Sequence, residues 1–124
     1  MIFKKLVQSK NINPSITLLE LFKKTNKKLI LCTTCLNTKE SVYLSYDNFP
    51  NLDILTAMRM TTAVPLLFPP ILYENKLYVD GGLLNNFPIE IFDNPENIIG
   101  ICIKGDIKLN DQIKTLENYL INIF

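Results

Sequence analysis

Two stretches of this chain are apolar on both faces of an expected β-strand, and they constrain the fold more than any other feature. They are residues 28–36 (KLILCTTCL) and residues 97–104 (NIIGICIK). A strand of this kind is covered by other elements above and below. We therefore expect an α/β layered fold in which both strands lie inside a sheet. The chain supplies few helices and edge strands for this, so either some apolar surface stays exposed or another segment completes the sheet.

The other elements alternate with these two strands. Helical spacing predicts one helix that begins at residues 13–15 and closes at Lys23-Lys24, and another in residues 105–124. Between them, a helix is predicted over residues 51–62, with Leu52, Leu55 and either Met58 or Arg59 on one side. Residues 40–46 predict a strand that returns alongside the first. Residues 71–73 and 77–79 predict a hairpin whose turn contains Asn75, a residue type that tolerates a positive φ.

Charge and hydropathy exclude several classes of protein. The net charge of +1, without a basic stripe, gives no reason to propose a nucleic-acid partner. The longest apolar run, residues 63–72, contains prolines and is shorter than the roughly 20 residues of a membrane-spanning helix. No N-terminal signal sequence is visible, so we expect a soluble protein. Paired lysines in the N-terminal third fit a solvated helix face, with peripheral membrane contact as the alternative.

Cys32 and Cys35 form a C-x-x-C pair inside an expected strand, where positions i and i+3 face opposite sides. The chain contains no histidine and one further cysteine, Cys102, so a four-ligand zinc site of Cys and His cannot be built. We expect no metal and no cofactor. Buried reduced thiols are the expected state of the pair, which favours a reducing compartment without fixing the location.

Residues 76–88 (KLYVDGGLLNNFP) carry the candidate chemistry. An apolar strand runs into Asp80, and Gly81 and Gly82 follow at once. A carboxylate presented at a strand end is a candidate general base, although Asp-Gly taken alone is usually only a turn. The surrounding motifs favour the base: residues 57–65 (AMRMTTAVP) and 68–70 (FPP) lie upstream, and residues 85–88 (NNFP) lie downstream.

Together these motifs resemble the patatin-like phospholipases, acyl hydrolases that cut ester bonds in lipids. The family's Ala-x-Pro, Phe-Pro-Pro, Val-Asp-Gly-Gly and Asn-x-Pro elements occur here in the same order, over residues 13–104. The resemblance implies a Ser-Asp dyad in which Asp80 accepts the proton of a serine on a Gly-x-Ser-x-Gly elbow. Gly81 and Gly82 would let the backbone turn sharply beside that serine. Asn86 would order the following loop, which ends in Pro88.

The chain also departs from the family pattern. Its serines are Ser9, Ser15, Ser41 and Ser45. None is flanked by glycines, and no glycine-rich run is present to form an oxyanion hole. In the family both elements lie N-terminal to the motifs seen here. Residues 13–104 are therefore expected to be the C-terminal portion of a patatin-like domain, followed by a C-terminal helix at 105–124.

This departure fixes the expected fold and function. We expect a partial three-layer sheet with helices on both faces, incomplete at its N-terminal side. The chain would bind a lipid or ester substrate only when an N-terminal half completes it, and it would be inactive alone. Its uncovered strands make self-association one expected consequence. Two alternatives stay open: a non-catalytic remnant or interaction module on the same scaffold, and a free-standing small α/β binding protein.

Overall fold

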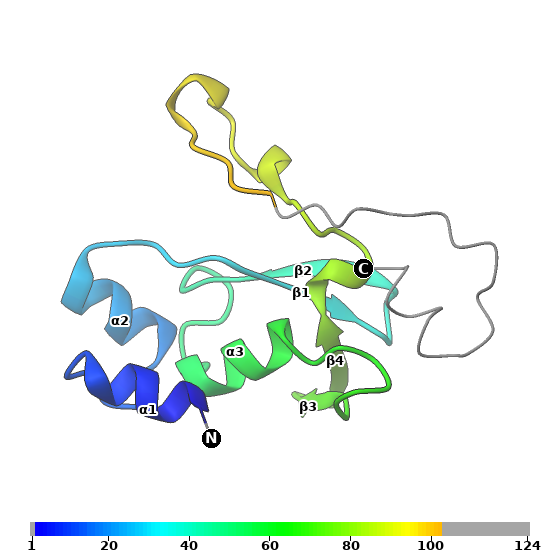
Figure 1. Ribbon diagram of the computed structural model, residues 1–124, viewed down its shortest axis with the longest axis horizontal. Helices are drawn as coiled ribbons and strands as arrows, with labels where there is room; N and C mark the ends of the chain where they lie inside the picture. Colours follow the sequence, from blue (N-terminus) through cyan, green and yellow to red (C-terminus); the bar gives the residue numbers. More distant parts are fainter. Residues whose placement is uncertain (1, 103–124) are drawn as a thin grey trace.

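The computed structural model describes residues 2–102, which form one antiparallel sheet and three α-helices (Figure 1). The strands lie in the order β2-β1-β4-β3. Their bounds are Leu31–Cys35 (β1), Glu40–Leu44 (β2), Ile71–Tyr73 (β3) and Lys76–Asp80 (β4). The helices are Ile2–Ser9 (α1), Leu18–Thr25 (α2) and Ile54–Thr61 (α3). The expected α/β class is confirmed, and the predicted strands at residues 28–36 and 40–46 are present in shorter form.

β1 occupies the middle of the sheet and therefore has neighbours on both edges. Thr33 lies opposite Val42 of β2 and opposite Asp80 of β4. Three consecutive side chains of β1 are almost fully buried: Thr33, Thr34 and Cys35. Because successive side chains of a strand point to opposite faces, this run shows that both faces of β1 are covered. The double-sided apolar pattern predicted this for residues 28–36.

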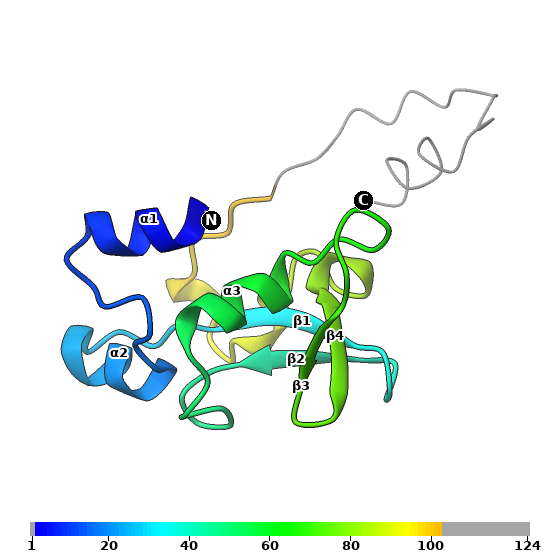
Figure 2. The ribbon, with the colours of Figure 1, turned by 90° about the horizontal axis from the view of Figure 1, so that it is seen from below.

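α3 covers one face of the sheet and lies between it and α1 (Figure 2). Its buried side is formed by Ile54, Ala57 and Met60. Of the expected side, Leu52 is buried just before the helix, whereas Leu55 and Met58 are only partly buried. Asp53 is the N-cap, and its Oδ1 accepts a hydrogen bond from the Thr56 N–H at 2.9 Å.

The helix predicted to begin at residues 13–15 begins instead at Leu18. Thr17 is the N-cap, since its hydroxyl oxygen accepts the Glu20 N–H at 3.2 Å. In return, the Glu20 carboxylate accepts the Thr17 N–H at 2.9 Å. This reciprocal capping box satisfies two backbone donors at the helix start, which a start at Ser15 would leave without such partners.

The hairpin of β3 and β4 is confirmed at the predicted place. Its two turn residues, Glu74 and Asn75, have φ of 46° and 59°. Positive φ at both central positions is the signature of the type I′ turn, whose twist matches that of the flanking strands. This turn directs β4 back between β3 and β1, and so it sets where Asp80 emerges from the sheet.

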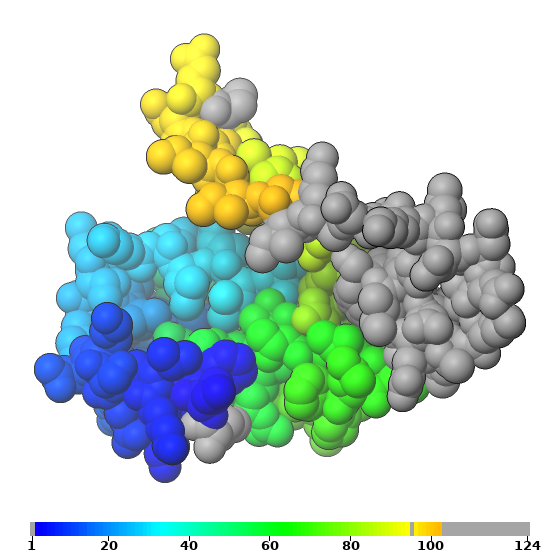
Figure 3. Space-filling model, in the orientation of Figure 1, coloured from blue at the N-terminus to red at the C-terminus, as the bar shows by residue number. Residues whose placement is uncertain are grey.

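The predicted strand at residues 97–104 is wrong for the part that the structure describes. Residues 98–102 form no strand, and Ile99 and Ile101 are 95% and 84% exposed. They belong to a segment after β4 that stands out from the body of the molecule, drawn in yellow and orange in Figure 3. No strand within residues 2–102 pairs with this segment, so its apolar side chains are not covered by a sheet there. The helix predicted in residues 105–124 lies outside the described residues.

α1 was not expected, and it packs on α3 with Val7 buried. Its lysines, Lys4 and Lys5, are exposed, as expected for a solvated helix face. In the described part of the chain, no helix has the length and apolar character needed to cross a bilayer.

Candidate active site

Asp80 is the last residue of β4, and the backbone holds it from two sides. Its N–H donates to the Ala63 carbonyl at 3.0 Å, which ties the strand end to the residue just after α3. Its Oδ1 accepts the Gly82 N–H at 2.7 Å. Asp80 is thereby the N-cap of a 3₁₀ turn, η1 (Gly81–Leu83), and the side chain remains half-buried. Within residues 2–102, the second carboxylate oxygen, Oδ2, has no hydrogen-bond partner.

Gly81 is buried directly against β1. A β-carbon at this position would lie 2.4 Å from the carbonyl oxygen of Cys32 and 2.9 Å from its Sγ. Neither Gly81 nor Gly82 has a positive φ. The expected reason for the glycines, a sharp turn that needs their conformational freedom, was therefore wrong. At position 81 the requirement is steric, because β4 leaves the sheet in contact with the backbone of β1.

The loop after η1 is ordered by Asn85, not by Asn86. The Asn85 side-chain amide donates to the Tyr43 hydroxyl at 3.0 Å and also to the Glu90 carboxylate. Its N–H donates to the Gly81 carbonyl at 2.9 Å. Asn86 is exposed and makes no hydrogen bond within the described residues, which overturns its expected role. Pro88 is half-buried and precedes the next 3₁₀ turn, η2 (Ile89–Ile91).

Comparison with known proteins decides the family. The family model for patatin-like phospholipases matches residues 2–93, a stretch that includes Asp80 and the loop up to Pro88. The chain belongs to the patatin-like phospholipase family. Its antiparallel sheet and three helices are consistent with a partial patatin-like domain.

Two viral proteins are similar to this patatin-like chain. A probable lipid hydrolase of Invertebrate iridescent virus 6 is 39% identical over 93 residues, which cover 73% of this chain and 32% of that protein. An uncharacterized protein of Acanthamoeba polyphaga mimivirus is 32% identical over 110 residues, which cover 82% of this chain and 37% of that protein. The patatin-like chain thus spans about a third of the length of these relatives.

The two cysteines of the C-x-x-C pair lie on opposite faces of β1, as expected. Cys35 is buried in the core opposite Tyr78 of β4, in the same cluster as Met60. Cys32 is only half-buried and lies on the side of Asn85, whose carbonyl is 3.8 Å from the Cys32 Sγ. Burial, with the negative charges of Asp80 and Glu90, raises the pKa of the Cys32 thiol. The expected full burial of both thiols was therefore correct for Cys35 alone. Within residues 2–102, no group of three potential metal ligands occurs.

Two threonines stabilise the strand and helix ends around Asp80. Thr33 lies opposite Asp80, and its hydroxyl is 2.7 Å from the Val79 carbonyl and 3.1 Å from that of Met60. The Thr61 hydroxyl donates to the Cys32 carbonyl. These contacts join α3, β1 and β4 at the point where Asp80 leaves the sheet. The sequence indicated Thr33 only as part of a strand motif, because a buried bridging hydroxyl has no pattern of its own.

Proposed function

We propose that this chain supplies the general base, Asp80, of a lipid ester hydrolase whose nucleophilic serine lies in a separate, N-terminal segment. The observation that carries the proposal is the state of the Asp80 carboxylate. One oxygen is fixed by the Gly82 N–H, and no group within residues 2–102 occupies the other. A general base needs an acceptor atom that is held in a fixed orientation and lies within hydrogen-bond reach of the hydroxyl proton that it removes. The Asp80 Oδ2 is such an oriented acceptor.

The chain's own serines do not take the place of the nucleophile. The Ser9 hydroxyl donates to the Leu6 carbonyl at 2.7 Å within α1. Ser45 is buried, and its hydroxyl lies 3.4 Å and 3.2 Å from the side-chain oxygens of Asp47 and Asn48. None of the described serines is hydrogen-bonded to Asp80. A second segment with a Gly-x-Ser-x-Gly elbow would place a serine on a strained turn, exposed to a base.

The substrate class in this proposal is a lipid ester. It rests on membership of the patatin-like phospholipase family and on the viral relative that carries the name of a probable lipid hydrolase. In the first half-reaction, the serine oxygen attacks the ester carbonyl and its proton passes to Asp80. Asp80 then gives this proton to the leaving alkoxide, which departs as the alcohol. In the second half-reaction a water molecule passes a proton to Asp80, attacks the acyl-enzyme and releases the acid, and the proton returns to the serine oxygen. The oxyanion donors would come from the same N-terminal segment, because this chain has no glycine-rich run.

A reconstitution experiment tests the proposal. The nucleotides upstream of the first codon are read in all frames for a glycine-rich loop and a Gly-x-Ser-x-Gly elbow, and the encoded segment is co-expressed with this chain. We expect hydrolysis of a p-nitrophenyl ester by the pair and no hydrolysis by this chain alone. Asp80→Asn should abolish the activity, whereas Asp93→Asn, at an exposed acidic position outside the site, should leave it intact. Activity of the pair that survives Asp80→Asn would refute the role of Asp80.

The alternative is a non-catalytic protein that keeps the patatin scaffold. What favours it is that no serine of the given sequence is flanked by glycines. The bond from Oδ1 to Gly82 would then be only a cap of η1. If no upstream segment with an elbow exists, or if the reconstituted pair stays inactive, this alternative holds.

A further inference from the structure

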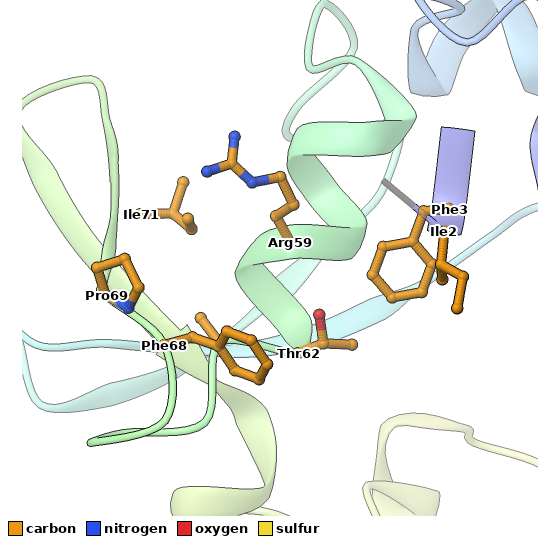
Figure 4. Close-up of a pocket in the computed structure, with 8 residues that line it drawn as sticks. Ile2, Phe3, Arg59, Thr62, Phe68, Pro69 and Ile71 are labelled. Carbon is orange, nitrogen blue, oxygen red and sulfur yellow. The ribbon is translucent and has the colours of Figure 1, made fainter. Parts of the chain in front are cut away.

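A cavity of about 410 Å³ opens between α1, α3 and the connection from α3 to β3. Its volume falls in the range of about 300–1,000 Å³ that is typical of small-molecule sites. The wall is mainly apolar, with Phe3 from α1, Phe68 and Pro69 from the connection, and Ile71 from β3 (Figure 4). A hollow of this size and character suits a hydrocarbon chain.

Arg59 supplies the positive charge at this cavity. Its side chain extends from α3 on the side of Ile71 (Figure 4). Within residues 2–102 the guanidinium forms neither an ion pair nor a hydrogen bond. A guanidinium presents a planar set of N–H donors that matches a carboxylate with two parallel bonds. An apolar hollow with one such group at its wall has the chemistry of a site for an acid with a long tail.

The same wall is poorly suited to a polypeptide segment. A peptide backbone buried there would need partners for its N–H and C=O groups. Besides Arg59, Thr62 is the polar side chain of the lining, and its hydroxyl is already bonded to the Met58 carbonyl at 2.7 Å. An alkyl tail needs no such partners, so a lipid is favoured over a peptide.

We propose that this cavity binds a fatty acid, with its alkyl tail against Phe3, Phe68 and Ile71 and its carboxylate on Arg59. Ala63, which is part of the wall, accepts the Asp80 N–H at 3.0 Å, so the wall is joined to the backbone of the candidate base. A fatty acid is the class of product that hydrolysis of a lipid ester releases. That the cavity holds a reaction product rests on the proposed function, whereas fatty-acid binding by the cavity does not.

Equilibrium binding to the intact 124-residue chain tests the assignment without any catalysis. The probe is cis-parinaric acid, whose fluorescence rises in apolar surroundings, and oleate below its micelle concentration is the competitor. We expect Arg59→Gln to weaken oleate binding about tenfold or more, the value of one lost charge-assisted hydrogen bond. Arg59→Lys should retain part of the affinity. Oleyl alcohol, which has the same tail and no carboxylate, should compete equally well in wild type and Arg59→Gln.

A matched pair of loop variants tests the location. Phe68 and Leu67 are neighbours, 57% and 70% exposed, and only Phe68 lines the cavity. We expect Phe68→Ser to weaken binding severalfold and Leu67→Ser to leave it unchanged, with circular dichroism confirming that each variant is folded. Three results would overturn the assignment: no binding of either fatty acid, an equal loss of affinity in Phe68→Ser and Leu67→Ser, or an oleate affinity that is the same in Arg59→Gln as in wild type. Because binding is read without a nucleophile, inactivity of the reconstituted pair would refute the proposed function and leave this site untouched.

Discussion

Gly81 lies so close to Cys32 that a β-carbon at position 81 would stand 2.4 Å from the Cys32 carbonyl oxygen. The contact holds the exit of β4 against the middle strand, at the residue that follows Asp80. The carboxylate is therefore positioned partly by the absence of a side chain next to it. A substitution that leaves Asp80 itself intact can thus still displace the candidate base.

We expect Gly81→Ala to lower the free energy of unfolding by about 1–3 kcal/mol, the usual cost of overpacking. The added methyl group meets backbone atoms of β1, which cannot move without disturbing the sheet. Chemical denaturation measures the change. Gly100→Ala is the control, because the nearest atom there, at 2.9 Å, is the far end of the Phe87 side chain, which can rotate away. Equal losses in the two variants would contradict the steric explanation.

Thr33 and Thr34 are neighbours in β1 for which the same substitution should have different effects on stability. Thr33 is fully buried and its hydroxyl serves the Val79 and Met60 carbonyls, so Thr33→Val should cost about 1–3 kcal/mol. Thr34 is also buried, at 2% exposure, and its buried hydroxyl has no hydrogen-bond partner within residues 2–102. Thr34→Val should therefore be neutral or stabilising. Thermal unfolding of both variants decides the point, and a comparable loss for Thr34→Val would reveal a partner for its hydroxyl.

The start of α2 can be located by removing side-chain caps. Thr17→Ala deletes the hydroxyl that accepts the Glu20 N–H, and we expect a loss of about 1 kcal/mol in unfolding free energy. Ser15→Ala, two residues earlier, removes a hydroxyl at an exposed position outside the helix and should change stability little. If Ser15→Ala proved the more damaging of the two, the helix would begin where its apolar spacing alone placed it.

The Cys32 thiol gives the stability a defined dependence on pH. Burial and the nearby negative charges raise its pKa above the ordinary value of 9.0, so the folded state keeps a proton that the unfolded state releases. Its contribution is fully present below pH 9 and is lost as the pH rises through the raised pKa. Burial also raises the pKa of Tyr73 and Tyr78, which add a similar decline at higher pH.

We therefore expect Cys32→Ala to lose less stability than wild type when the pH rises from 8 to above 9. Denaturation curves at a series of pH values measure the difference. Cys102→Ala removes an exposed thiol and should follow the wild-type curve. Identical curves for wild type and Cys32→Ala would mean that the thiol is not held protonated by the fold.

The sequence predicted the elements whose signals are local. The hairpin of β3 and β4 was located because Asn75 tolerates the positive φ that a type I′ turn requires. β1 was located because a strand covered on both faces must be apolar on both. In contrast, the start of α2 was misplaced because its apolar spacing extends upstream to Ile16, and only the pairing of Thr17 with Glu20 marks the boundary.

Features that depend on distant contacts were not predictable in the same way. Residues 97–104 have the composition of a core strand, yet Ile99 and Ile101 are exposed because composition does not supply a neighbouring strand. Similarly, Asn85 and Asn86 are indistinguishable in sequence, and only the fold brings Tyr43 within reach of the first of them. Asp80 was singled out as a candidate base from its motif, and that role remains a prediction. The steric role of Gly81 could be recognised only once the position of Cys32 was known.

The central place of β1 also has a consequence for the order of folding. The β1–β2 and β3–β4 hairpins each form between residues that are close along the chain, whereas the Thr33 hydroxyl meets the Val79 carbonyl across a separation of 46 residues. Closing that long loop costs conformational entropy before other contacts can offset the loss. The two hairpins are thus expected to form early and to join late. Asp80 lies at their junction, so the candidate base reaches its position only in the last assembly step of the sheet.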